Sequence, residues 1–200
     1  MRWNLTLRVT ALMWLITFCG IGLAAKRHLF RVSVDTSPLV DHPAGPFSLL
    51  LVMTDGTGIA DGKATATITR VELGGGKPLG QPFLAGGATG DLSNTVIISN
   101  SSSVSVFEET FLAGERLSFH VSFEPERTET GLPTGLALYI LDGRGNPIAT
   151  TSPASDFLSF DLTFDDLDFS VYASNPSQSP FAGGVIDIPA PKRAITESGV

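Results

Sequence analysis

Cysteine and tryptophan are scarce in this 200-residue chain, which has one cysteine and two tryptophans. All three residues, Cys19, Trp3 and Trp14, lie within the first 25 positions. The 175 residues that follow hold no cysteine, so no disulfide can stabilise them. Their stability has to come from an apolar core, and a single domain of this length can bury roughly 70% of its unfolded surface.

Long apolar runs are also scarce, and the longest one lies near the N-terminus, at residues 9–23. Arg2 and Arg8 precede this run, and Ala24 and Ala25 follow it. This order of basic, apolar and small residues is typical of a secretory signal peptide. The run is shorter than the roughly 20 apolar residues of a membrane-spanning helix. We therefore expect cleavage near Ala24 or Ala25, secretion to the cell envelope or the extracellular space, and contact with a membrane only before cleavage.

Basic residues are few beyond this leader. The chain has 13 lysines and arginines against 20 aspartates and glutamates, and two of the basic residues lie in the leader. The remaining 11 basic residues give a formal net charge of −9. Such a surface repels phosphate backbones, and the sequence shows no run of lysines and arginines that would offset this, so we expect no nucleic-acid partner.

Alternation of apolar and polar residues dominates the rest of the chain. It is clearest in the segments 63–73, 116–123 and 157–164, where apolar residues alternate with polar ones, most of them serine, threonine, aspartate or histidine. This period of two predicts strands with one buried face. Further strands are expected at 29–35, 47–54, 94–99, 103–107, 136–141, 148–151 and 167–172.

No segment after the leader sustains a helical pattern, and clusters of Gly, Pro, Asn and Asp separate the expected strands. The sequence therefore predicts an all-β fold, an antiparallel β-sandwich or jelly roll of about 7 to 10 strands. We expect three regions: a signal-peptide helix at 1–25, the sandwich at 26–173, and a flexible tail rich in Pro, Ser and Gly at 174–200.

The segment 137–152, ALYILDGRGNPIATTS, predicts a hairpin turn between two β-rich runs. Gly143 and Gly145 adopt a positive φ without steric cost, and Pro147 has no N–H to donate to a strand ladder. Turn chemistry alone accounts for the acidic, glycine-rich composition of this segment.

A calcium ion is the alternative that the acidic loops raise. Asp55, Thr57 and Asp61 lie in the loop TDGTGIADGK, and Asp142 lies in the turn described above. Calcium prefers several converging oxygen ligands, which these side chains and nearby carbonyl groups could supply. The loop departs from the helix-loop-helix calcium motif, because Ile59 occupies a ligand position and no glutamate ends the loop. The other acidic candidates for such a site are the pairs Glu108/Glu109 and Asp165/Asp166.

Catalytic motifs are absent from the sequence, which contains neither the G-x-S-x-G nor the H-E-x-x-H pattern. The three histidines, His28, His42 and His120, are scattered, and we expect His120 on the polar side of its strand. Glu124 and Glu126 flank a proline in an acidic loop, where we expect solvated carboxylates rather than a glycosidase pair. We therefore expect no enzyme, no catalytic residue and no cofactor other than the calcium considered above.

An aromatic platform for sugars is the third alternative. Such platforms favour tryptophan and tyrosine, and after the leader the chain has only Tyr139 and Tyr172. Most phenylalanines fall in the apolar phase of the expected strands, so we expect them in the core. Composition therefore argues against a conventional sugar platform.

From about residue 31 to residue 164 the chain resembles bacterial secreted proteins that carry a PEP-CTERM sorting tail. The resemblance rests on an ordered series of blocks: VSVDTSPL, DGTGIADGKATATIT, LGGG, TGDLSNTVIIS, FLAGERLSFHVSF and GLPTGLALYILDGRGNPIATTSP. These blocks are patterned rather than catalytic, and no family active site is carried over.

The resemblance implies export, processing by an exosortase-type transpeptidase, and association with exopolysaccharide or biofilm. The C-terminal end departs from the family pattern, because IPAP at 188–191 is followed directly by KRAITESGV, without the family's apolar helix. The expected function is thus a non-enzymatic envelope or extracellular-matrix protein whose partners are extracellular polysaccharide or other matrix proteins. The alternative is a calcium- or polysaccharide-binding module that uses the acidic glycine-rich loops.

Overall fold

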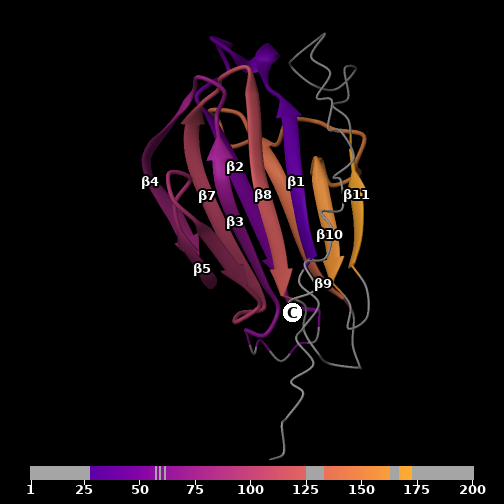
Figure 1. The fold of residues 1–200 in the computed structure, drawn as a ribbon. Coiled ribbons are helices and arrows are strands. Elements are labelled where there is room, and N and C mark those ends of the chain that lie inside the picture. The colour runs from indigo at the N-terminus through magenta and orange to yellow at the C-terminus, as the bar shows by residue number, and fades with distance from the viewer. Residues whose placement is uncertain are drawn as a thin grey trace, which may run out of the picture.

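The computed structural model describes residues 28–56, 58, 60, 62–124, 133–162 and 167–172. In these residues the chain forms a five-stranded and a six-stranded antiparallel sheet, which pack face to face (Figure 1). The predicted all-β sandwich is confirmed. The expected signal peptide at 1–25 and the expected tail at 174–200 lie outside the described residues. Within the described residues, no helix is long and apolar enough to cross a bilayer.

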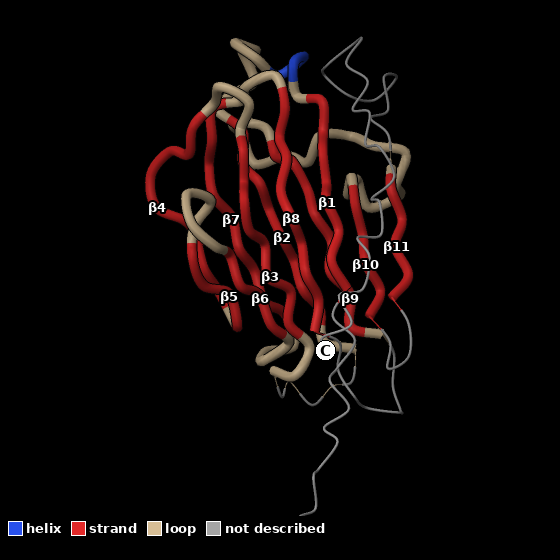
Figure 2. Tube along the Cα trace, viewed as in Figure 1, coloured by secondary structure: helices blue, strands red, loops and turns tan. Residues whose placement is uncertain are grey.

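The eleven described strands are connected by turns and loops, with one short 3-10 helix between the first two strands, at the top of Figure 2. The elements are β1 (His28–Asp35), η1 (Ser37–Leu39), β2 (Phe47–Thr54), β3 (Thr65–Glu72), β4 (Lys77–Ala85), β5 (Gly87–Gly90), β6 (Val96–Ser99), β7 (Val104–Leu112), β8 (Arg116–Glu124), β9 (Thr134–Leu141), β10 (Leu158–Leu162) and β11 (Leu167–Val171).

The strand order is that of a jelly roll with an extended sheet. The five-stranded sheet has the order β1-β8-β3-β6-β5, and the six-stranded sheet has the order β11-β10-β9-β2-β7-β4. The first strand therefore pairs with the eighth, the second with the seventh and the third with the sixth, which is the wrapped pairing of a jelly roll. The last three strands form a meander that widens the six-stranded sheet beside β2.

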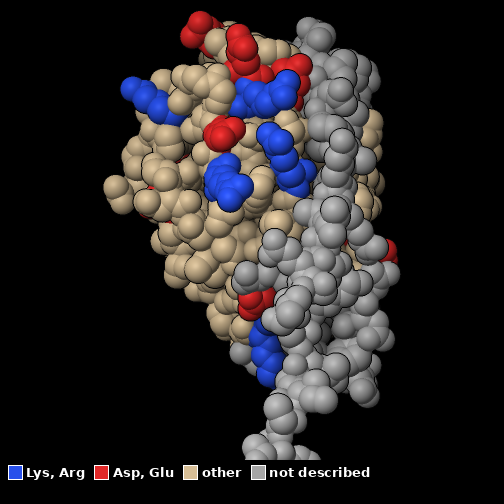
Figure 3. Space-filling view, viewed as in Figure 1, with Lys and Arg blue, Asp and Glu red and all other residues tan. Residues whose placement is uncertain are grey.

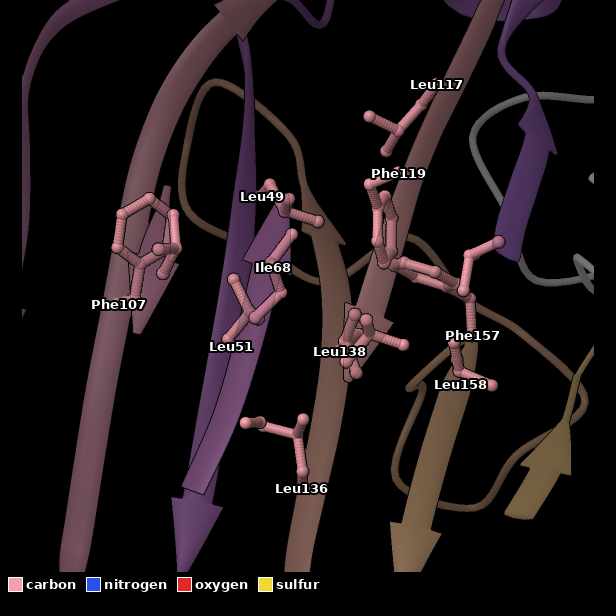
Figure 4. Close-up of a cluster of buried hydrophobic side chains, with 14 of the residues drawn as sticks. Leu49, Leu51, Ile68, Phe107, Leu117, Phe119, Leu136, Leu138, Phe157 and Leu158 are labelled. Carbon is pink, nitrogen blue, oxygen red and sulfur yellow. The ribbon is translucent and has the colours of Figure 1, made fainter. Parts of the chain in front are cut away.

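The alternation in the sequence produces the core. In β8 the residues Leu117, Phe119, Val121 and Phe123 are all buried, whereas His120 is only partly covered. Equivalent residues of the facing sheet meet them, and Figure 4 shows Leu49, Leu51, Leu136 and Leu138 converging on this layer with Phe107 and Phe157. Burying side chains of this size stabilises a fold by about 1.5–3 kcal/mol each.

Four phenylalanines close the core at the edge where β1, β8, β10 and β11 meet. The ring of Phe30 lies 6.1 Å from Phe123, 5.4 Å from Phe160 and 5.5 Å from Phe169, measured between centroids. These tilted and edge-on arrangements are favoured by aromatic quadrupoles. Phe169 is 38% exposed and covers the open edge between the two sheets.

Two strands form where the sequence predicted none. β4, with the sequence KPLGQPFLA, contains two prolines and a glycine, which argue against a strand in a sheet interior. β4 lies instead at the edge of the six-stranded sheet, and its pairing with β7 is irregular between Leu79 and Phe83. β5 is a four-residue edge strand of the other sheet. These two strands raise the number above the expected 7 to 10.

One expected strand, 148–151, is wrong. After the turn the chain makes isolated bridges at Pro147, which pairs with Leu141, and at Thr150, and the Ile148 N–H donates to the Ile140 carbonyl. The Thr150 hydroxyl then donates to the carbonyl of Asp156 at 2.7 Å. Because this side chain closes a loop, the backbone of the segment leaves the sheet.

Candidate functional site

Asp55, the first residue of the proposed calcium loop, has its carboxylate engaged within the loop. One oxygen accepts the N–H of Ala60 at 2.8 Å, and the other accepts the side-chain amide of Asn100 at 3.2 Å. Asn100 is fully buried and its own carbonyl oxygen accepts the N–H of Ala64 at 3.0 Å. Asp55 therefore fastens the start of the loop to the beginning of β3. Thr57 and Asp61 lie outside the described residues.

Asp142 organises the turn of the segment 137–152. Its Oδ1 accepts the N–H groups of Arg144 at 2.9 Å and of Asn146 at 2.8 Å, and the Asn146 side chain also donates to the carboxylate. Burial alone would raise the pKa of Asp142, but these hydrogen bonds from Asn146 and Arg144, with the positive charge of Arg144, leave it below its ordinary value. In the described turn, this carboxylate acts as a side-chain cap for the backbone.

The two aspartates lie at opposite ends of the same strand. Asp55 follows the last residue of β2, whereas Asp142 follows Leu141, which pairs with Ser48 near the first residue of β2. Eight residues of strand separate them by more than roughly 20 Å, so Asp142 does not complete a site with Asp55. Within the described residues, no three His, Cys, Asp or Glu side chains gather closely enough to hold a metal ion. A calcium site formed by Asp55, Thr57 and Asp61 stays a prediction.

Glu109 differs from the other acidic candidates, because its side chain points into the sandwich. It is 3% exposed, and its Oε2 accepts the N–H of Leu92 at 2.7 Å. Burial raises the pKa of Glu109, the hydrogen bond from Leu92 opposes this rise, and the negative charge of Asp91 adds to it. The carboxylate thus connects β7 to the turn between β5 and β6. Its companion Glu108 lies on the outer side of β7, while Asp165 and Asp166 lie outside the described residues.

An open cleft of about 780 Å³ lies at the end of the sandwich where η1, the β3–β4 turn and the β7–β8 loop meet. Its charged residues, Asp41, Lys77 and Glu115, are exposed, and His42 accepts the N–H of Ala44 through Nδ1 at 3.1 Å. The remaining lining comes largely from apolar side chains and from the glycines of the two connections. The cleft therefore offers exposed charges rather than a buried acid or base.

The outer face of the five-stranded sheet is broad and polar. Its strand register places side-chain hydroxyls in rows across neighbouring strands. Ser122 and Thr67 face each other, as do Ser33 and Ser118. Among the described residues, Leu29 and Ile97 are the only large apolar side chains that are exposed on this face. An extended face of this kind offers many weak polar contacts rather than one deep pocket.

Three exposed arginines gather on this face. Arg31 on β1 faces His120 on β8, and Arg116 lies four residues before His120 on the same strand, about 13 Å away. Arg70 lies on β3 beside His120, in a bulge between Thr69 and Glu72. Figure 3 shows lysine and arginine side chains gathered over the upper part of this face, with acidic side chains between them. We call Arg31, Arg70, Arg116 and His120 together the arginine face.

The pKa of His120 lies below its ordinary value. Partial burial lowers the pKa of His120, and the charges of Arg70 and Arg31 lower it further, while Glu72 opposes them. The nearest carboxylates accept hydrogen bonds from serines, and Asp35 also faces Arg116 across β1 and β8, where its charge interacts with that of the arginine. Asp35 accepts the N–H and hydroxyl of Ser37 at 3.0 and 2.7 Å, and Glu72 accepts the hydroxyl of Ser118 at 3.3 Å.

The sequence reasoning missed this arginine cluster, because it considered only runs of lysines and arginines along the chain. The three arginines are 39 and 46 residues apart along the chain, so no run reveals them. The pairing of β1, β8 and β3 brings them together. The available signal was the phase of each strand: Arg31 and Arg116 alternate with the apolar residues that the same strands bury.

The outer face of the six-stranded sheet has a different composition. Ala85, Val106, Val52 and Ala137 form one row across β4, β7, β2 and β9, and Leu50 lies in the next row, between Glu108 and Tyr139. Phe83, which is 61% exposed, faces Glu108 from the edge strand. We call Leu50, Val52, Ala85, Val106 and Ala137 the apolar face.

A comparison of the chain with protein-family models, with curated proteins and with solved structures finds no match. A proposal for the function therefore rests on the sequence, the fold and these two surfaces.

Proposed function

We propose that the protein is a secreted, non-enzymatic component of the bacterial envelope or extracellular matrix that acts through the surfaces of its β-sandwich. The observation that carries this proposal is the broad, polar outer face of the five-stranded sheet, with its rows of hydroxyls and its three exposed arginines. A flat field of this size suits an extended polymer or another protein better than it suits a small substrate, which requires a concave site.

The N-terminal sequence and the family resemblance support the location. Residues 1–25 have the order of basic, apolar and small residues that directs secretion. The blocks shared with PEP-CTERM proteins imply a protein associated with exopolysaccharide or biofilm. The part of the chain after residue 25 has a large apolar core and no cysteine, which also suits an oxidising compartment, because it has no thiols there to oxidise or mispair.

The test is export and retention. The full chain is expressed in a Gram-negative bacterium that produces an exopolysaccharide matrix, and the cytoplasmic, periplasmic and matrix fractions are analysed by immunoblotting and N-terminal sequencing. We expect a product that begins near residue 25 or 26 in the matrix fraction. Ile16→Arg, which interrupts the apolar run of the leader, is the matched control and should keep the chain inside the cell. Unprocessed wild-type chain confined to the cytoplasm would contradict the proposal.

A further inference from the structure

We propose that the arginine face binds an acidic polysaccharide, with carboxylates of the polymer pairing with Arg31, Arg70 and Arg116. Serine and threonine hydroxyls of the same sheet would bond the sugar hydroxyls. The inference rests on the proposed function, because it names the class of matrix polymer that the protein would hold.

The distribution of charge is the first argument. The whole chain carries a formal net charge of −7, yet half of the six lysines and arginines in the described residues lie on this one face. Arginine has a planar guanidinium group that matches a carboxylate through two parallel hydrogen bonds. Asp35 faces Arg116 across β1 and β8 and interacts with its charge, whereas Arg31 faces His120 and Arg70 lies in the bulge of β3. Arg31 and Arg70, which are exposed and face no carboxylate in this register, can therefore meet an external anion, and Arg116 lies beside them.

The backbone at Arg70 is the second argument. Arg70 has a φ of 53°, in the left-handed region that favours glycine, at the point where the register between β3 and β8 shifts. A non-glycine residue in this conformation is strained. The bulge keeps Val71 against the core while Arg70 points outward beside His120. Bulges commonly re-aim a side chain in this way near binding sites.

The surroundings of the arginines favour a polysaccharide over a nucleic acid. Hydroxyl groups lie beside the charged residues, at Ser33, Thr67, Thr69 and Ser122, and such groups can donate to and accept from sugar hydroxyls. Within the described residues this face carries no phenylalanine, tyrosine or tryptophan on which bases could stack.

The test measures binding of the full chain to polygalacturonate, a chain with one carboxylate per sugar, by isothermal titration at low and high salt. Dextran, which is uncharged, and single-stranded DNA are the comparison polymers. We expect binding to polygalacturonate that weakens at least tenfold between about 50 and 500 mM NaCl, because salt screens the attraction between the arginines and the carboxylates of the polymer. Dextran should bind far more weakly, and so should the DNA.

The variant for this experiment is the triple change Arg31→Gln, Arg70→Gln and Arg116→Gln, which should weaken binding at least thirtyfold. The double change Arg31→Gln and Arg116→Gln leaves the bulge untouched and should weaken binding about tenfold, so a folding defect at Arg70 cannot explain the loss. Arg144→Gln removes an arginine that is also exposed, from the turn after β9, and should leave binding unchanged. Melting by circular dichroism checks that each variant is folded.

Three results would overturn the inference: no binding of the wild-type chain to polygalacturonate, equal binding by the triple variant, or equally tight binding to DNA. These results are distinguishable from failure of the proposed function, because export and matrix retention are measured separately in cells. A chain that is exported and retained, but whose triple variant is retained equally well, would keep the matrix role and remove the arginine face from it.

Discussion

The two outer faces of the sandwich are built on the same core but present different chemistry. The five-stranded sheet turns arginine, histidine, serine and threonine outward, whereas the six-stranded sheet turns outward the apolar row Ala85, Val106, Val52 and Ala137. Both sheets fill the interior with the same kinds of residue, namely leucine, isoleucine, valine and phenylalanine. The buried side chains therefore explain the fold, and the outward-facing side chains of each strand are the ones that can determine a function.

The difference follows from the composition of the central strands. β2, with the sequence FSLLLVMT, is apolar on both sides, as strands covered on both faces usually are. β8, with RLSFHVSF, alternates strictly and suits a face in contact with water. An exposed apolar surface marks an interaction site without indicating the chemistry of the partner. The charges of the arginine face indicate that its partner is an anion.

The largest expected effect tests whether the two faces share one interior. Phe107 lies beneath the apolar face and Phe119 beneath the arginine face, and both are almost fully buried. Changing either residue to alanine should lower the free energy of unfolding by about 3–5 kcal/mol, because each change opens a large cavity. Urea denaturation measures this loss. A loss below about 1.5 kcal/mol at one position only would show that the two sheets do not bury a common core.

A smaller effect separates the backbone role of Arg70 from its charge. Arg70→Gly relieves the left-handed backbone, so we expect the free energy of unfolding to stay the same or to rise by up to about 1 kcal/mol. Binding of polygalacturonate should nevertheless weaken, because the guanidinium is lost. Thermal melting and titration on the same sample compare the two results. A glycine variant that is clearly less stable would mean that the Arg70 side chain supports the fold.

Glu109 in the six-stranded sheet and His120 in the five-stranded sheet should give the free energy of unfolding opposite dependences on pH. Burial raises the pKa of Glu109 above 4.5, so the folded state binds its proton more tightly than the unfolded state does. The contribution of this proton to the stability of the fold is present at low pH and is lost as the pH rises through the raised pKa. Glu109→Gln should remove this loss when urea denaturation is followed from pH 4 upward. If the free energy of unfolding of this variant still falls with rising pH as it does in the wild type, Glu109 is not the cause of the loss.

His120, on the other sheet, shows the reverse sign. Its pKa is lowered from 6.5 by burial and by Arg70 and Arg31, so the unfolded state binds the proton more tightly. Stability is full above pH 6.5 and declines as the pH falls through the lowered pKa. His120→Gln should abolish this decline, measured by the same denaturation series. A decline that persists in the variant would assign it to another group.

The smallest effect concerns the exposed edge of the six-stranded sheet. Phe83 is 61% exposed, so Phe83→Ser should change the free energy of unfolding by no more than about 0.5 kcal/mol. The variant should bind less of a hydrophobic dye such as ANS, because Phe83 lies beside the apolar face, and polygalacturonate binding should stay unchanged. Reduced polymer binding would show that the two faces do not act separately.

Much of the fold could be predicted from the sequence, because alternation is a local property of each strand. The buried residues of β8 and β10 follow the predicted phase. β4 could not be predicted in this way, since its prolines and glycine are acceptable only at an edge, and the edge is defined by pairing with β7. The expected strand 148–151 failed because hydrogen bonds from Thr150 and Ser152 to Asp156 hold a loop.

The candidate site was less predictable for a related reason. Asp55 and Asp142 looked similar in sequence, as aspartates before glycine, but the register of β2 and β9 places them at opposite ends of the sandwich. Arg31, Arg70 and Arg116 looked unrelated, and the pairing of β1, β3 and β8 joins them. Strand order is set by contacts between distant segments, so no local pattern contains it.

The measurement that tests this account most directly is a map of amide chemical shifts in the isotope-labelled full chain during titration with a short oligogalacturonate. The account predicts that amides on the arginine face, among them Arg31, Thr67 and His120, shift and saturate together, while Val52, Val106 and Ala137 on the apolar face do not move. Shifts confined to the apolar face, or to the acidic turn at Asp142, would contradict it.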